Sequence, residues 1–171
     1  MKLSFLFRCA LSSSAIYIAI KLSVFFTHSQ FTGIGIYSGL ISLALLGIPL
    51  FIGIKHRRDS ELGGYIYLRQ IMITGVVISL MSSLIISIYT YVHYKFIDKD
   101  SIAYWIEEAK QLGANEKKSE LEIQQAIQML TEFYSPFKQA TVALTGVLGT
   151  GAVMSFMFAA FLIKRPPASE N

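Results

Sequence analysis

The fold is decided by an uninterrupted apolar run in the middle of the chain, Ile71–His93. It reads IMITGVVISLMSSLIISIYTYVH and contains no Asp, Glu, Lys or Arg. A helix of about 20 apolar residues is long enough to cross the hydrocarbon core of a bilayer, which is about 30 Å thick. Because the run is continuous and does not alternate between apolar and polar residues, it predicts a membrane-spanning helix and argues against a barrel strand.

Three further stretches share this length and composition, at about Leu3–Phe26, Gly33–Ile54 and Ala140–Ile163. Of the 171 residues 53% are hydrophobic and only 15% are charged, whereas about 25% are charged in a soluble domain. We therefore expect a single all-α membrane domain over residues 1–171, built as a four-helix transmembrane bundle. A cleaved signal peptide is the alternative for the first stretch, but its apolar run is too long and is interrupted by Lys21.

The distribution of basic residues predicts the orientation. Eight of the fifteen lysines and arginines flank one set of span ends: Lys2, Arg8, Lys55, Arg57, Arg58, Arg69, Lys164 and Arg165. Only Lys95, Lys99 and Lys138 flank the other set. The positive-inside rule then places both termini and the loop between the second and third spans in the cytoplasm. This bias also accounts for the net charge of +4, so no nucleic-acid partner is expected.

The segment 98–138 is the long external connection between the third and fourth spans. It holds eight acidic residues and five lysines, and apolar residues recur every three to four positions. We expect an amphipathic hairpin of two helices, Ser101–Leu112 and Glu116–Tyr134, interrupted by Gly113. A segment this short rarely carries its own core, so the apolar stripe around Trp105 must pack on the spans, the membrane surface or a partner.

The cytoplasmic loop 55–69 is the most distinctive stretch. Gly63 and Gly64 permit a turn that other residues resist, and Tyr65 follows at a depth where aromatic rings favour the lipid headgroups. Arg57 and Arg58 have two interpretations. They anchor the loop on the cytoplasmic side, or they dock a lipid phosphate or a partner, because guanidinium groups bind phosphate bidentately.

Small residues at four-residue spacing predict where the helices pack. They are Gly35 and Gly39 in the second span, and Gly75, Ser79, Ser83 and Ser87 in the third. Pro49 is expected to kink the second span. Lys21 is the one clear ionisable residue inside a span, and it has two interpretations. Its side chain extends along the helix so that the amine reaches the outer interface, or the amine faces inward and has a structural or proton-relay role.

No catalytic, cofactor-binding or metal-binding motif is present in the sequence. The single cysteine, Cys9, excludes an intrachain disulfide, and there is no HExxH, GxSxG, P-loop or CxxC pattern. We expect a non-enzymatic inner-membrane subunit or accessory protein that contacts membrane lipids and a membrane-protein partner or a second copy. The alternatives are a small oligomeric transporter or channel and, third, a protein acting on lipid-linked substrates. The lack of Asp or Glu within the spans disfavours ion-coupled transport.

Several segments together resemble a known family. They are the stretch from Arg57 to Ile66, the Ile88–Tyr91 aromatic segment, the Phe133–Phe137 segment and the basic tail at Lys164 and Arg165. On these residues the chain resembles the four-span membrane proteins of Bacteroidota in domain-of-unknown-function family 4199. The resemblance implies the inner membrane of a Gram-negative cell, and it implies no activity and no catalytic residue.

Overall fold

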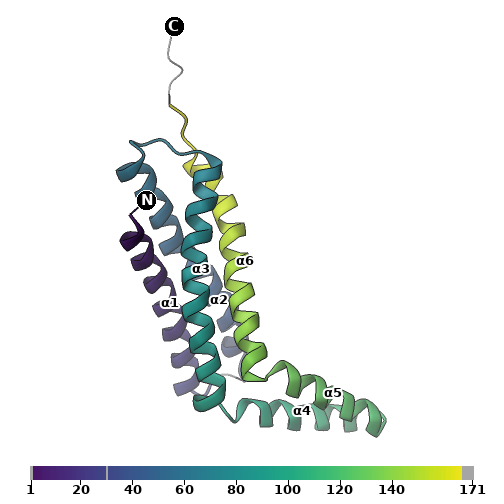
Figure 1. Ribbon diagram of the computed structural model, residues 1–171. Coiled ribbons are helices and arrows are strands. Elements are labelled where there is room, and N and C mark those ends of the chain that lie inside the picture. Colours follow the sequence, from purple (N-terminus) through teal and green to yellow (C-terminus); the bar gives the residue numbers. More distant parts are fainter. Residues whose placement is uncertain (1, 30, 167–171) are drawn as a thin grey trace. The chain divides into compact units, whose positions relative to one another are not determined.

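The computed structural model describes residues 2–29 and 31–166, and all of its long elements are helices (Figure 1). The helices are α1 (Leu3–Phe26), α2 (Gly33–His56), η1 (Arg57–Glu61), α3 (Leu68–Val92), η2 (His93–Ile97), α4 (Ser101–Asn115), α5 (Glu120–Phe133) and α6 (Pro136–Leu162). Four of them, α1, α2, α3 and α6, are long and apolar enough to cross a membrane. The predicted all-α class and the four long apolar helices are thereby confirmed.

The chain divides into two compact units, and α3 and α6 each pass through both. The first unit comprises Met1–Ile86 and Leu144–Asn171. In it α1, α2, α3 and α6 lie side by side (Figure 1). Each of the four helices contributes to one apolar core: Leu6 and Ala10, Leu50 and Ile54, Ile71 and Ile78, and Ala159 and Leu162. Helix α2 is continuous through Pro49.

Both described ends of the chain meet the α2–α3 connection in the first unit. The backbone N–H of Lys2 donates to the Glu61 carboxylate at 2.7 Å. Near the other end, Lys164 forms an antiparallel backbone bridge with Ile66. The connection can turn here because Gly63 and Gly64 adopt φ values of 63° and 89°, a region that residues with a Cβ rarely adopt.

Helices α3 and α6 approach closely at two reciprocal contacts between a glycine and a serine. A Cβ added at Gly75 would overlap the side chain of Ser155, and one added at Gly151 would overlap the side chain of Ser79. Ser83 is fully buried farther along α3. By contrast, a Cβ added at Gly39 would meet no atom within 4 Å. Gly35 and Gly39 were expected to form a packing face, but among the described residues no helix packs closely against Gly39.

The second unit, Ser87–Ala143, contains the helical hairpin. Helix α4 does not stop at Gly113 as expected but continues to Asn115. It ends where Lys117 takes a left-handed φ of 54°, because the Lys117 and Lys118 amides then bond the Ala114 and Gly113 carbonyls.

The start of α5 is fixed by a capping box. The Ser119 side chain accepts from the Glu122 amide, and the Glu122 carboxylate accepts from the Ser119 amide. This reciprocal pair begins the helix at Glu120 rather than at the expected Glu116. Helix α6 starts at Pro136, four residues before the expected Ala140, because proline suits the first position of a helix.

The apolar stripes of α4 and α5 face each other. The Trp105 ring stacks on Tyr134 with 6.0 Å between centroids, and Gly113 packs against Ile123 so closely that a Cβ would overlap it. Part of the stripe is thus buried inside the hairpin itself, an arrangement that the sequence did not suggest.

Candidate functional site

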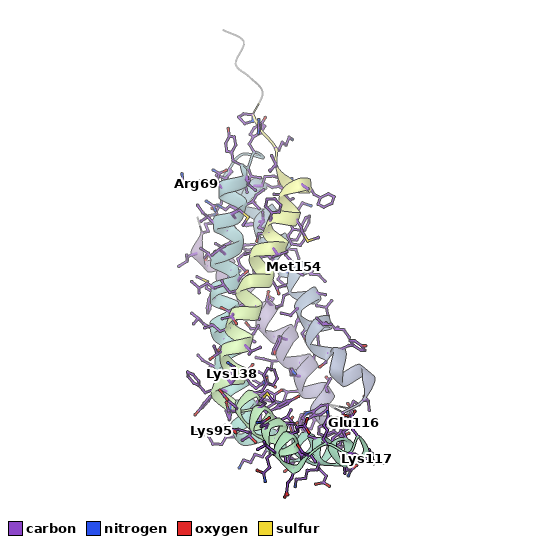
Figure 2. The ribbon with its side chains drawn as sticks, turned by 90° about the vertical axis from the view of Figure 1, so that its right-hand side faces the viewer. Arg69, Lys95, Glu116, Lys117, Lys138 and Met154 are labelled. Carbon is purple, nitrogen blue, oxygen red and sulfur yellow. The ribbon has the colours of Figure 1, made fainter. Side chains whose placement is uncertain are left out.

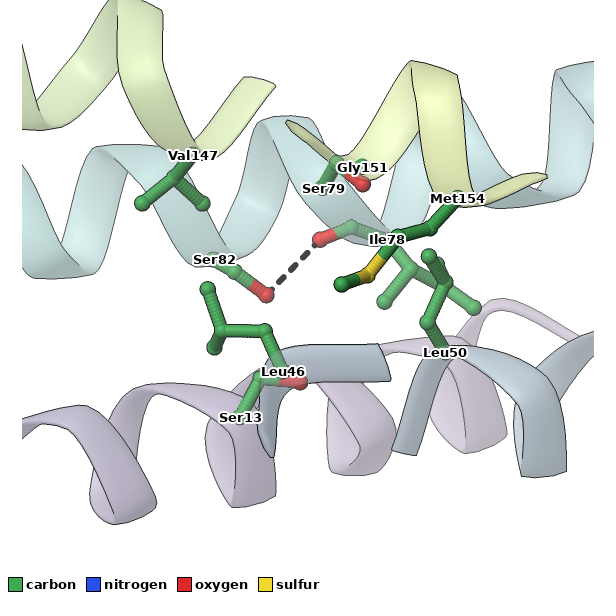
Figure 3. A pocket seen from close by; sticks show the side chains of 9 residues that line it. All are labelled: Ser13, Leu46, Leu50, Ile78, Ser79, Ser82, Val147, Gly151 and Met154. Atoms are coloured by element: carbon green, nitrogen blue, oxygen red, sulfur yellow. Dashed lines mark hydrogen bonds between the residues drawn. The ribbon is translucent and has the colours of Figure 1, made fainter. Parts of the chain in front are cut away.

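The four long helices enclose a small cavity in the first unit (Figure 3). Its lining combines apolar side chains with three serines: Ser13, Leu46, Leu50, Ile78, Ser79, Ser82, Val147, Gly151 and Met154. The volume of about 10 Å³ is near the lower limit for one water molecule. The Ser82 hydroxyl donates to the Ile78 carbonyl at 2.9 Å (dashed line in Figure 3). None of the described residues that line this cavity has an ionisable side chain.

Arg57 points into the first unit instead of presenting its guanidinium at the surface. Its Nη1 donates to the Gln70 carbonyl at 3.2 Å and to the Thr74 hydroxyl. Its Nε is buried without a partner among the described residues. The Arg57 side chain therefore ties the end of α2 to the first turns of α3, and these contacts compete with a role in binding a lipid phosphate.

Arg58 also has a partner. Its Nε lies 2.6 Å from Oδ1 of Asp59, in a pair that is partly exposed. Tyr65 lies under the Lys164 ammonium, 5.8 Å from the ring centroid. The predicted loop residues thus have different roles. Gly63 and Gly64 form the turn, Tyr65 contacts Lys164 just after α6, and the charge of Arg58 is paired with that of Asp59.

A shallow groove of about 370 Å³ lies beside these residues. Its lining comes from α1, α2 and η1: Phe5, Phe51, Ile52, Lys55, His56, Asp59 and Ser60. The Phe5 ring stacks on the His56 imidazole at 3.7 Å between centroids, and Ser60 Oγ lies 3.4 Å from His56 Nδ1. The groove therefore has aromatic side chains together with one amine, one carboxylate and one hydroxyl.

The hairpin carries a second groove, of about 420 Å³, between α4 and α5. Leu112 and Met129 line it and are 50% and 65% exposed. Glu116, Lys118 and Glu122 supply its polar groups, and Figure 2 labels Glu116 beside Lys117 at this turn. Hydrogen bonds from Ser119 hold the pKa of Glu122 below its usual value, and the hydrogen bond with Glu116 raises the pKa of Lys118.

A buried polar cluster in the second unit was missed by sequence reasoning. The Ser101 hydroxyl donates to Asp98 Oδ2 at 2.6 Å, and that carboxylate lies 3.9 Å from His93 Nε2. On the other side of the imidazole, the Tyr89 hydroxyl lies 3.1 Å from Nδ1. His93 and Asp98 are only 4% and 7% exposed. Their five-residue spacing gave no signal, because it becomes a contact only through the π-helical turn of η2.

The remaining predicted residues lie apart from these grooves. Lys21 is half-buried on α1, and Trp105 packs inside the hairpin. Ser87 donates to the Ala140 carbonyl at 2.9 Å, so it joins α3 to α6 within the second unit. Among the described residues, no group of three or more His, Cys, Asp or Glu side chains is placed to hold a metal ion.

The chain was compared with curated proteins, solved structures and family models. No curated protein and no solved structure gives a significant match to the chain. A family model described as "Protein of unknown function (DUF4199)" matches residues 8–164. The match covers all four long helices and the hairpin between α3 and α6 almost completely, and on this basis the chain belongs to that family of unknown function.

Proposed function

We propose that the protein crosses the inner membrane of a Gram-negative bacterium of the Bacteroidota four times, as a four-helix bundle with both termini cytoplasmic. In this proposal it acts as a non-enzymatic subunit or accessory protein. The length and composition of the four helices support the spans. The bias of basic residues supports the orientation, and the contacts of Lys2 and Lys164 with the α2–α3 connection are consistent with both termini lying on one side.

The observation that carries the proposal is the apolar surface left on the hairpin. After Trp105 and Ile123 have packed between α4 and α5, Leu112 and Met129 remain half or more exposed beside the groove. Large apolar side chains that gather at a groove with a polar rim are typical of an interaction site.

The charge of the hairpin indicates the kind of partner. Helices that bind anionic lipid surfaces are rich in Lys and Arg, whereas residues 98–138 carry a net charge of −3. The groove itself is lined by Glu116, Lys118 and Glu122, so its charged side chains sum to −1. We therefore assign the groove to a membrane-protein partner that inserts an apolar side chain flanked by basic residues.

The cavity between the four helices gives no support to the alternative of a transporter or channel. With room for about one water molecule and a lining without ionisable side chains, it offers neither a pathway nor a coupling site in a single copy. No observation in the described residues favours an enzyme that acts on lipid-linked substrates.

Crosslinking and copurification from native membranes test the proposal. Met129→Glu places a carboxylate in the groove, and we expect the crosslinked partner to be lost while the helical content is unchanged. Gln124→Glu adds the same charge on the opposite side of α5 and serves as the control that retains the partner. Retention of the partner by Met129→Glu would rule out the groove as the binding site. Robust solute flux into proteoliposomes that contain only the purified chain would contradict the accessory role and favour a transporter.

A further inference from the structure

The groove of Phe5, Phe51, Ile52, Lys55, His56, Asp59 and Ser60 lies where α2 changes from apolar to polar. Phe51 and Ile52 lie one turn before Lys55 and His56, and Asp59 and Ser60 lie one turn after them. Residues at this spacing lie on one face of a helix. A ligand in the groove therefore meets apolar side chains at one end and charged or hydroxyl groups at the other.

The two charges of the groove have opposite sign. Lys55 is exposed, and its ammonium has no hydrogen-bond partner among the described residues, so it can bind a phosphate oxygen. The Asp59 side chain is 43% exposed. Within the described part of the chain, Arg58 Nε donates to Oδ1 and no group donates to Oδ2, so Oδ2 is available as an acceptor. A purely anionic ligand would form an ion pair with Lys55 but not with Asp59, and an uncharged ligand would form an ion pair with neither.

From this arrangement we propose that the groove binds the phosphoethanolamine headgroup of a membrane phospholipid. The phosphate pairs with Lys55, the primary ammonium donates to Asp59 Oδ2, and the glycerol and first acyl carbons lie against Phe51 and Ile52. Placing this end of α2 at headgroup depth rests on the four-span arrangement proposed above.

The chemistry also selects among phospholipids. A phosphocholine headgroup has the same net charge, but its quaternary ammonium has no N–H to donate to Asp59. A phosphoglycerol headgroup has no cation, so it cannot form an ion pair with Asp59. The groove is therefore expected to prefer phosphatidylethanolamine over both phosphatidylcholine and phosphatidylglycerol.

Native mass spectrometry of the full chain in detergent, with equal amounts of the three lipids, tests this preference. We expect about two- to fivefold more phosphatidylethanolamine bound than either competitor, the factor that one exposed charge pair contributes. Asp59→Asn should abolish the preference, and Lys55→Gln should lower the binding of all three lipids. Equal binding of the three lipids by the unaltered chain would overturn the proposal.

A control variant separates the groove from general effects of charge and folding. Arg69→Gln removes an exposed cation that does not line the groove. It is expected to keep the preference for phosphatidylethanolamine. If the chain fails to insert into membranes, the four-span proposal fails; if it inserts and melts normally but does not discriminate among the lipids, only the groove assignment fails.

Discussion

Gly151 of α6 lies against Ser79 of α3 so closely that a Cβ on the glycine would overlap the serine side chain. Four residues away on each helix, the roles reverse, and Gly75 of α3 lies against Ser155 of α6. Both serines are buried, and the Ser155 hydroxyl donates to the Gly151 carbonyl at 2.6 Å within its own helix. The contact therefore depends on close backbone approach, which is how helices associate where no hydrophobic effect drives them together.

This contact predicts a large difference between two glycines of α6. Gly151→Ala should destabilise the protein by about 1–3 kcal/mol, since the added methyl overpacks the contact with Ser79. Gly146→Ala is the matched control on the same helix, because its Cβ would meet no atom within 4 Å. Thermal unfolding in detergent measures both, and equal melting temperatures would mean that the close approach does not stabilise the fold.

Arg57 is expected to contribute to stability through its bonds to α3. Arg57→Gln removes the donor to the Gln70 carbonyl and the Thr74 hydroxyl, at a cost of about 1–3 kcal/mol for hydrogen bonds from a charged group. Arg69→Gln removes an exposed cation at the start of the same helix and should leave the melting temperature unchanged. A normal melting temperature for the Arg57 variant would show that these contacts do not stabilise the fold.

The capping box of α5 predicts a pH dependence. Hydrogen bonds from Ser119 lower the pKa of Glu122 below its ordinary value of 4.5. The folded hairpin then binds this proton less tightly than the unfolded chain, so the stabilisation is present above that value and is lost as the pH falls through the lower folded pKa. NMR titration of labelled glutamates should show the pKa of Glu122 rising in Ser119→Ala and unchanged in Gln124→Ala; an unchanged pKa in Ser119→Ala would contradict the hydrogen-bond origin.

The orientation is checked by labelling of single cysteines. In a chain without Cys9, an impermeant thiol reagent added to cells with a permeabilised outer membrane should label Ser119→Cys and spare Ser60→Cys. Both serines are exposed, so a difference between them reports the side of the membrane rather than burial. Labelling of the Ser60 variant alone would reverse the proposed orientation.

The number, type and approximate limits of the long helices could be predicted from local sequence alone. Hydrophobic length is a local property, so the sequence shows it directly, although α6 begins at Pro136 and not at the expected Ala140. The acidic amphipathic hairpin was also predictable, because its 3.6-residue period is local. Its helix ends were wrong by a few residues, since the bonds around Lys117 and Ser119, and not Gly113, fix them.

Which side chains face one another could not be predicted from the sequence and depends on how the helices pack. A helix that is apolar on all sides carries little periodicity, so its sequence does not distinguish Gly151, which packs closely, from Gly39, which does not. The same holds for Arg57, whose inward direction depends on acceptors in a different helix. The burial of His93 beside Asp98 likewise follows from a π-helical turn. These outcomes rest on contacts between residues distant in sequence or on a backbone irregularity, and neither is visible in a hydrophobic pattern.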